Sequence, residues 1–431
     1  WNNPYPASES GRNILYSSFS ERPKHLDPAQ AYTADEYDFI WQVYEPPLQY
    51  HYLKRPYTLI PATAAAIPTA RYFSGTGAEL PASARDIAYS VYEIRIKPGI
   101  RYQPHPAFAR DAAGRSLYLG LAPGDLRGKF RLADFPRSGS RELVAADYVY
   151  QIKRLAHPRI HSPILGHMSD YIVGLKEYAA LLEQEDKALQ AGRREGTPAA
   201  WASLAKHEIA GVEVVDRYTY RIKVRGKYPQ FIYWLAMPFF APVPPEADRF
   251  YAQAGMAEKN LSLDWYPVGT GPYMLTENNP NARMVLARNP NFRGEAYPSE
   301  GEPEDAALGL LADAGNTAPF IDSIVFTREK EGIPYWNKFL QGYYDTSGVS
   351  SDSFDQTVRI STGGGADLTD SMKERGIRLS TKQVLSVSYF GFNMSDSVVG
   401  GLAPERCKLR QAISIALESS SLEANCLKYF M

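Results

Sequence analysis

The chain has 431 residues, 44% of them hydrophobic and 22% charged, which matches soluble globular proteins and excludes disordered and fibrous classes. With 47 Lys and Arg against 48 Asp and Glu, the formal net charge is -1, so global charge gives no reason to expect nucleic acid or an anionic membrane as partner. At about 150 residues per domain, the length suggests roughly three domains or two large lobes.

Patterns along the chain predict strands and helices in irregular alternation. In the first half of the chain we expect a strand over 13–19, a helix over 35–44, a strand over 89–97, a helix over 145–156, helical structure over 175–205 around a loop and a hairpin over 213–224. In the second half we expect a turn over 269–273 that leads into a strand, strands over 283–288 and 321–327, a helix over 334–340, an aromatic strand over 386–393 and a helix over 404–417. No fixed period relates them, which argues against repeat architectures and predicts a mixed α/β class.

Two of these segments carry more specific expectations. Tyr37, Ile40, Trp41 and Tyr44 recur at helical spacing, so they are predicted to form the inward stripe of the helix over 35–44. The segment 101–141 is rich in Pro, Gly and charge, which predicts a long excursion outside the core.

Tyrosine is frequent, with 30 residues against 18 phenylalanines and 6 tryptophans, and this excess favours surfaces that combine ring packing with hydroxyl hydrogen bonds. The longest apolar runs, such as 231–243, contain prolines and are shorter than the ~20 residues that a membrane-spanning helix needs. The chain opens at Trp1 without a signal-peptide pattern or a Cys for a lipid anchor. We therefore expect a secreted protein whose signal peptide is absent from this chain.

Short catalytic signatures are missing. The sequence contains no G-x-S-x-G, H-E-x-x-H, Walker or G-x-G-x-x-G motif. Gly363–Gly365 lacks the Lys or helix signal of a phosphate loop and predicts a flexible turn. Pro158 separates His157 from His161, so loop or cleft-lining histidines are favoured over a metal site. We predict no catalytic residue, no metal and no cofactor, while a secreted hydrolase with a carboxylate pair stays an alternative.

Cys407 and Cys426 are the only cysteines. Their spacing is compatible with a local disulfide, and two buried free thiols are the alternative. Without a Cys/His cluster, a structural zinc site is not expected.

An ordered series of landmarks without catalytic character runs through the chain. It consists of Leu26-Asp27-Pro28, Val43-Tyr44-Glu45-Pro46, Tyr92–Lys97 before Pro98-Gly99, Val144–Arg154, Gly211–Val224, Pro242–Pro245, Pro267–Tyr273, Arg288-Asn289-Pro290-Asn291-Phe292, Asp322–Phe326, Gly342–Asp345, Phe392-Asn393 and Lys408–Ile413. Their order and spacing, from about Asn13 to Leu417, resemble the family 5 extracellular solute-binding proteins, the peptide-binding receptors of bacterial ABC importers.

The resemblance implies an α/β, two-lobed periplasmic-binding-protein-like (type II) fold with an inserted subdomain in lobe I. Lobe I would take 1–47 and, with the hinge, 206–272; the insert would take 48–205, and lobe II 273–431. Family members normally continue well past the helix that ends near Leu417. We therefore expect a partial lobe II, whether from a fragment, joined segments or a shortened lobe. The carboxylate that peptide-binding relatives use for the ligand's α-amino group lies in that missing portion and is not assigned.

The family pattern also implies which segments face the ligand. These are Ala31, Tyr32 and Thr33 of lobe I, Gly166, His167 and Met168 of the insert, and Tyr389, Phe390 and Gly391 of lobe II. The alternative for Tyr389 and Phe390 is strand alternation, with one side chain in the lobe core. Gly269, Gly271 and Tyr273 are expected to serve the interlobe hinge.

The function implied is that of a monomeric, periplasmic receptor that captures di- or oligopeptides between two lobes and delivers them to the permease subunits of an ABC transporter. Closure around the solute would supply contacts made only in the closed state. A receptor for another solute, such as an oligosaccharide, a nickel chelate or haem, is the first alternative. The secreted hydrolase and a structural or interaction protein without a deep cleft are the others.

Overall fold

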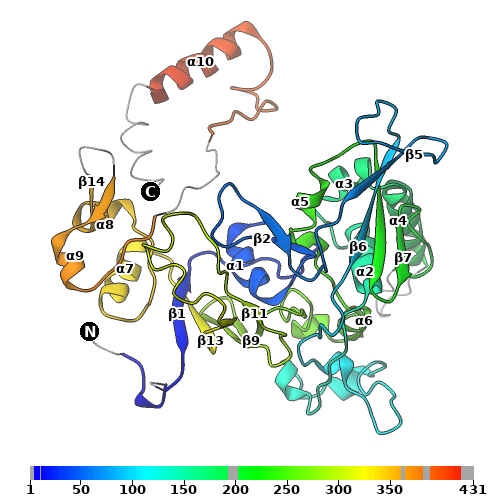
Figure 1. Cartoon of the computed structure of the whole chain (residues 1–431), viewed down its shortest axis with the longest axis horizontal. Coiled ribbons are helices and arrows are strands. Elements are labelled where there is room, and N and C mark those ends of the chain that lie inside the picture. The colour runs from blue at the N-terminus through cyan, green and yellow to red at the C-terminus, as the bar shows by residue number, and fades with distance from the viewer. Residues whose placement is uncertain (1–3, 10, 193–201, 361–364, 382–388, 419–431) are drawn as a thin grey trace. The chain divides into compact units, whose positions relative to one another are not determined.

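The computed structural model describes residues 4–9, 11–192, 202–360, 365–381 and 389–418 (Figure 1). The chain divides into two compact units. The large unit comprises residues 6–328, and the small unit comprises residues 329–431 together with residues 1–5.

The first sheet of the large unit joins the beginning of that unit to its end. Its strand order is β1 (Ile14–Phe19), β13 (Ser323–Arg328), β10 (Arg283–Arg288) and β9 (Tyr273–Asn279). β1 pairs parallel to β13, whereas the other neighbours are antiparallel. Helix α1 (Ala34–Val43) packs on this sheet, with the Phe39 ring 4.8 Å from that of Phe326 and 5.9 Å from that of Phe19.

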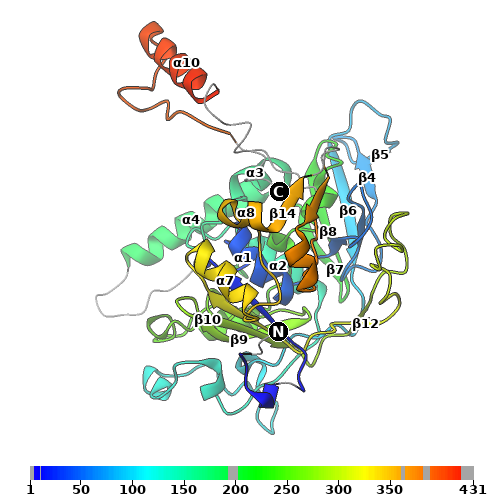
Figure 2. The same cartoon turned by 90° about the vertical axis from the view of Figure 1, so that its left-hand side faces the viewer.

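The second sheet is wholly antiparallel. Its strand order is β5 (Glu79–Leu80), β4 (Ala70–Phe73), β6 (Tyr89–Arg95), β8 (Thr219–Arg225) and β7 (Val212–Asp216). The alternation that predicted β6 is realised, since Tyr92 and Ile94 are buried while Glu93 and Arg95 face solvent. Helices α2 (Ala145–Leu155), α3 (Leu165–Tyr171) and α4 (Leu175–Ala191) lie on one side of this sheet (Figure 2).

Shorter elements complete the large unit. They are the hairpin β2 (Leu48–Tyr50) and β3 (Leu59–Pro61), the pair β11 (Glu295–Ala296) and β12 (Thr317–Ala318), helices α5 (Phe231–Trp234) and α6 (Pro245–Tyr251), and the 3-10 helices Ala7–Glu9, Pro106–Phe108, Pro123–Leu126, Leu132–Asp134, Pro238–Phe240 and Ala257–Lys259.

The small unit has its own core, in which Trp336, Leu368 and Met372 are buried. Its elements are α7 (Gly332–Leu340), α8 (Ser351–Thr357), the hairpin β14 (Val358–Ile360) and β15 (Ala366–Leu368), α9 (Asp370–Glu374) and α10 (Pro404–Glu418). In the described ranges of both units, none of the helices has the length and apolar character to cross a bilayer.

Three expectations from the sequence need correction. The segment 101–141 is not outside the core, because Tyr102, His105, Phe108, Leu126 and Phe135 are buried in the main hydrophobic cluster or against it. Burial lowers the pKa of His105 to about 3, and its Nε2 lies 2.8 Å from the Tyr251 hydroxyl. This segment is anchored by backbone hydrogen bonds to other segments, including one from Gln103 to the Gly269 carbonyl.

The second correction concerns α1. Of the four predicted side chains, Ile40 and Tyr44 are buried and Tyr37 is partly buried against the core, but Trp41 is 39% exposed. The buried face is completed by Glu36, Phe39 and Val43, so the prediction is wrong at Trp41 alone.

The third correction concerns the aromatic strand predicted over 386–393. Residues 389–393 form no strand, because none of the described residues pairs with them, and 386–388 lie outside the described residues. Of the helical structure predicted over 175–205, the described residues contain α4, while 202–205 are not helical and 193–201 lie outside the described residues. The glycines at 363 and 364 and Cys426 also lie outside the described residues, so the flexible turn and the disulfide stay predictions.

The predicted domain boundaries stay predictions as well. The five-stranded sheet takes β4–β6 from the expected insert (48–205) and β7 and β8 from the expected second segment of lobe I (206–272).

The residues of the predicted hinge form a close backbone approach to the end of α1. A Cβ at Gly269 would lie 1.9 Å from the Val43 carbonyl oxygen, and one at Gly271 would lie 2.6 Å from the Gln42 carbonyl oxygen. The Gly271 amide donates to the Val43 carbonyl at 2.8 Å, and the Tyr273 hydroxyl donates to the Ile321 carbonyl. Only glycine fits at 269 and 271 while α1 keeps its position.

We therefore expect Gly269→Ala to lower the free energy of unfolding by about 1–3 kcal/mol, the usual cost of overpacking, because backbone must move to admit the methyl group. The matched control is Gly124→Ala, which is exposed and has nothing within 4 Å of the added Cβ. Urea denaturation of both variants measures the difference. If the Gly269→Ala and Gly124→Ala variants were equally stable, the backbone of Gly269 would not be in tight contact with the end of α1 in solution.

Candidate functional site

The predicted lobe I segment is held in place by one carboxylate. Both oxygens of Glu36, on α1, accept two backbone hydrogen bonds each, from Lys24 and His25 and from Tyr32 and Thr33, at 2.9–3.1 Å. Thr33 is the N-cap of α1, so the same contacts close the start of the helix. The loop before α1 is thereby fixed at both of its ends.

These hydrogen bonds set the ionisation of Glu36. Burial alone would raise its pKa, but the backbone N–H groups of Thr33, His25 and Tyr32 outweigh burial and hold the pKa below its ordinary value. The carboxylate form therefore stabilises the loop. The loop in turn leaves the Tyr32 side chain 64% exposed, whereas the Ala31 side chain is fully buried.

The predicted insert segment lies within a cluster of aromatic rings at the surface of the large unit. The exposed His167 ring, on α3, lies 5.0 Å from the ring of Tyr171 and 5.3 Å from that of Trp234, on α5. Tyr228 stacks on Tyr171 with ring centroids 4.1 Å apart. We call His167, Tyr171, Tyr228, Trp234 and the exposed Tyr233 the aromatic surface.

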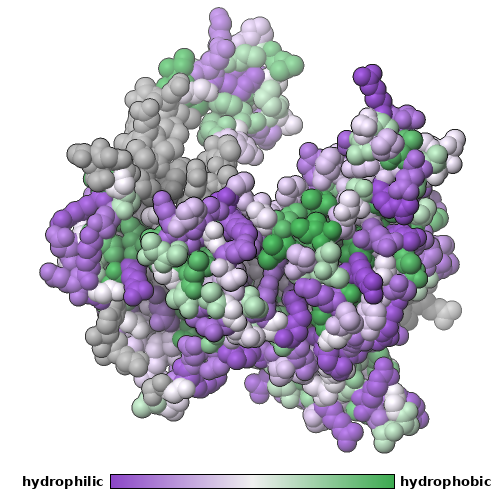
Figure 3. Space-filling model, viewed as in Figure 1, coloured by the Kyte–Doolittle hydropathy of each residue, from purple (hydrophilic) through white to green (hydrophobic). Residues whose placement is uncertain are grey.

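The hairpin of β2 and β3 extends the aromatic surface. The Leu48 amide donates to the Leu235 carbonyl at 3.0 Å, which ties β2 to the end of α5. Partial burial and the neighbouring Tyr233 raise the pKa of Tyr50, and the Tyr50 ring lies 5.8 Å from that of Tyr57. Apolar side chains also reach the surface in the region of α5 and β2 (Figure 3). Partly exposed rings with polar tips suit both stacking on a flat guest and hydrogen bonding to it.

The other predicted ligand residues are placed as follows. Gly166 is exposed beside His167, but the Met168 side chain is fully buried in the core, so it offers a ligand no side-chain contact. Tyr389 is 90% exposed and Phe390 is 66% exposed, and both belong to the small unit, as does Gly391. Neither aromatic side chain is in a core, so the alternation alternative for this pair is wrong. Sequence reasoning missed Tyr171, Tyr228, Tyr233 and Trp234, for which the high tyrosine count was the available signal.

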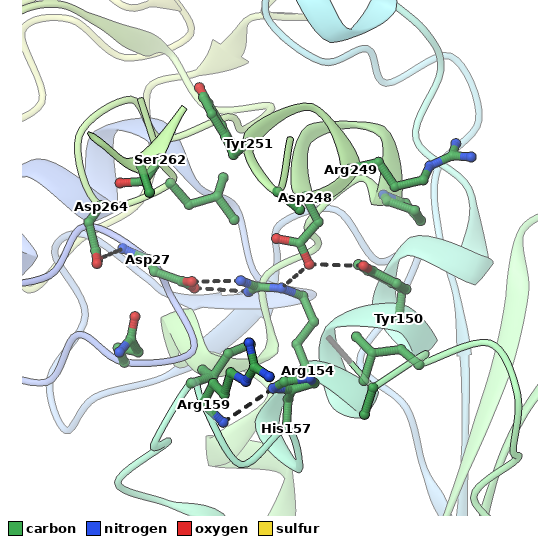
Figure 4. A pocket seen from close by; sticks show the side chains of 18 of the residues that line it. Asp27, Tyr150, Arg154, His157, Arg159, Asp248, Arg249, Tyr251, Ser262 and Asp264 are labelled. Carbon is green, nitrogen blue, oxygen red and sulfur yellow. Dashed lines mark hydrogen bonds and ion pairs between the residues drawn. The ribbon is translucent and has the colours of Figure 1, made fainter. Parts of the chain in front are cut away.

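A separate cavity of about 700 Å³ lies in the large unit between α2, α6 and the loops near residues 160, 204 and 262 (Figure 4). Arg154, which is almost fully buried, lies at its wall between two carboxylates. Its guanidinium donates to both oxygens of Asp27, at 2.9 and 2.6 Å, and to Asp248 at 2.8 Å. The Tyr150 hydroxyl also donates to Asp248, at 2.9 Å.

This network joins the loop before α1 to α2 and α6. Asp27 and Asp248 both bind the same guanidinium, which is the arrangement of a structural ion-pair network rather than of a general acid and base that face a substrate. Among the residues that the structure describes, no three His, Cys, Asp or Glu side chains gather closely enough to hold a metal ion.

The comparisons with known proteins identify the family. Residues 138–428, well over half of the chain, match the model of the bacterial extracellular solute-binding proteins, family 5 Middle. The chain therefore belongs to the family 5 bacterial extracellular solute-binding proteins, as the ordered landmarks predicted. This membership and the mixed α/β architecture confirm the predicted fold class, the two-lobed periplasmic-binding-protein-like (type II) fold.

Individual relatives are distant. The periplasmic oligopeptide-binding protein OppA of Salmonella typhimurium is 26% identical over 155 residues, which are 36% of this chain and 24% of that protein. Di/tripeptide-binding protein 2 of Pseudomonas aeruginosa is 26% identical over 194 residues, 42% of this chain and 34% of that protein. The solved structure of DppA from Helicobacter pylori with the peptide STSA aligns with a TM-score of 0.48 and 16% identity, over 82% of this chain and 50% of that one. The matched parts thus cover half or less of each of these proteins.

We expect Glu36→Gln to loosen the loop over 24–33, because an amide has one acceptor oxygen where the carboxylate has two. Since the folded-state pKa of Glu36 is lowered, the wild type has this stabilisation above the ordinary carboxyl pKa and loses it as pH falls through the lowered value. The Glu36→Gln variant has no titrating carboxyl at this position, so its stability should lack this contribution to the pH dependence. Hydrogen exchange of the amides of 24–33 and thermal unfolding between pH 7 and pH 3 measure both effects. The matched control is Asp35→Asn, one residue earlier; a loop that exchanges equally in both variants would contradict the role of Glu36.

Arg154→Met is expected to lower the free energy of unfolding by about 3–5 kcal/mol, because it leaves two carboxylates without their cation. Arg71→Met, which breaks an exposed pair with Glu79, should cost no more than about 1 kcal/mol. Adding Asp27→Asn and Asp248→Asn to Arg154→Met should restore part of the loss. Urea denaturation measures the free energy of unfolding of these three variants. If Arg154→Met lowered it by no more than Arg71→Met does, an ion-pair network of this strength would be excluded.

Proposed function

We propose that this chain is the solute receptor of an ABC importer, which binds di- or oligopeptides and passes them on to the permease chemically unaltered. The observation that carries the proposal is the family 5 match over residues 138–428. The names of the two curated relatives, an oligopeptide-binding and a di/tripeptide-binding protein, support peptides as the solute class. The periplasm, where one of them is named as residing, is the proposed location.

The described residues support two parts of a ligand wall. Tyr32 projects from a loop whose backbone Glu36 fixes, so binding a solute through its ring requires no ordering of that backbone. His167 lies in the aromatic surface, where rings and hydroxyls offer the mixed contacts that an extended peptide requires. Tyr389, Phe390 and Gly391 are the proposed partners from lobe II, and their exposure leaves them free to contact a solute.

The proposed division into lobes follows the sequence-based boundaries, with the hinge at Gly269, Gly271 and Tyr273. Gly269 and Gly271 pack tightly on the end of α1, and β9, which follows them, belongs to the same sheet as β1, so this hinge rests on the family pattern and not on the packing.

An oligosaccharide receptor of the same fold is the second candidate, because partly exposed aromatic rings also stack on sugar faces. A thermal-shift comparison of a peptide mixture with an oligosaccharide mixture separates the two.

We expect a mixture of di- to pentapeptides to raise the melting temperature, since a ligand at about 100 times its Kd stabilises the folded state by ~2.7 kcal/mol. Tyr32→Ala should reduce the shift, whereas Phe130→Ala, which removes a ring of similar exposure from another part of the large unit, should not. Mass spectrometry should recover the peptides intact. Absence of any peptide shift, or cleavage of the peptides, would contradict the proposal.

A further inference from the structure

The aromatic surface has a feature that a general peptide wall does not need: its rings are locked against one another and against the core. The Trp234 Nε1 donates to the Tyr228 hydroxyl at 3.0 Å, and the Tyr92 hydroxyl donates to the Tyr228 carbonyl at 3.0 Å. Phe231 is buried behind them, with its ring 5.0 Å from that of Tyr92. The exposed rings are thus preorganised by the core beneath them.

The ring orientations leave an incomplete aromatic cluster. Tyr171 and Tyr228 are nearly parallel, at 16°, while His167 meets Trp234 at 38° and Tyr171 at 57°. His167 is the exposed member of these pairs, and no hydrogen bond from the described residues reaches its ring. One further ring against His167 would continue the tilted packing that the cluster already uses.

Other guests fit this arrangement less well. A branched aliphatic side chain would bury area but would gain none of the ring–ring attraction. A cationic side chain could lie over a ring face, as Arg55 does over Tyr57 at 4.5 Å. However, Tyr228 covers one face of Tyr171, and the most exposed ring beside it is the imidazole of His167, which is not one of the ring types that attract cations best.

We infer that the solute is a peptide with an aromatic side chain, which packs against His167 and Trp234 on the aromatic surface. This inference rests on the proposed function, since it names the class of peptide that the receptor takes.

The test is isothermal titration calorimetry with four tripeptides, Ala-Phe-Ala, Ala-Leu-Ala, Ala-Lys-Ala and Ala-Ala-Ala. The ring of Ala-Phe-Ala would make two new ring contacts, with His167 and with Trp234, so we expect it to bind roughly tenfold more tightly than Ala-Leu-Ala. His167→Ala should reduce this ratio several-fold, because it removes one of the two rings that distinguish a phenyl from an isobutyl side chain. His167→Phe keeps a ring and should retain the preference, and Phe130→Ala is the exposed-ring control.

The outcomes separate the two proposals. Equal binding of Ala-Phe-Ala and Ala-Leu-Ala, or tighter binding of Ala-Lys-Ala, overturns the inference and leaves the peptide receptor standing. Binding of none of the four, and of no longer peptide, overturns the proposed function itself. A preference for Ala-Phe-Ala that survives in His167→Ala would place the aromatic subsite elsewhere and would also overturn the inference.

Discussion

The large unit depends on one buried cation. Arg154 bridges Asp27, which precedes α1, and Asp248 on α6, while it belongs itself to α2. A buried charge is expensive unless it is paired and hydrogen-bonded, so the three segments are held at the distances that the guanidinium fork requires. The loop that carries Tyr32 begins at this cluster and ends at Glu36, so its position is determined from both sides.

Polar groups and close backbone contacts therefore position α1 and the loop before it, while aromatic rings form the proposed ligand-binding surface. The Glu36 carboxylate orders the loop through four amides, and Gly269 and Gly271 let another segment touch the end of the same helix. α1 is thus fixed at both ends. On the aromatic surface the order comes from ring packing on Phe231 together with the hydrogen bonds of Trp234 and Tyr92 to Tyr228. Both kinds of support lower the entropy lost when a solute is bound.

The sequence was informative where a local pattern had a single structural solution. The alternation over 89–97, the hairpin over 213–224 and the strands at 283–288 and 321–327 were predicted correctly, because period and turn residues are local signals. The stripe of α1 was right at Ile40 and Tyr44 and wrong at Trp41, because the buried face also takes in Glu36, whose carboxylate is paired with backbone amides of the preceding loop that the helical period does not reveal. The segment 101–141 was misjudged for a similar reason: its composition is that of a loop, but backbone hydrogen bonds to Gly269 and within the segment hold its rings in the core. His167 was predicted from the family pattern. Tyr171 follows it by one turn of α3, whereas Tyr228 precedes α5 and Tyr233 and Trp234 belong to α5, so these three join His167 in the aromatic surface only in the folded chain.

The pairing of β1 with β13 has a consequence for how the protein is made. Asn13, next to the first strand, bonds to Asp322, which lies 309 positions later. A growing chain cannot complete this sheet until β13 has been synthesised, so β1 has no partner strand until then. Such sequence-distant closure slows folding and prolongs the time for which the strand edge is left unpaired.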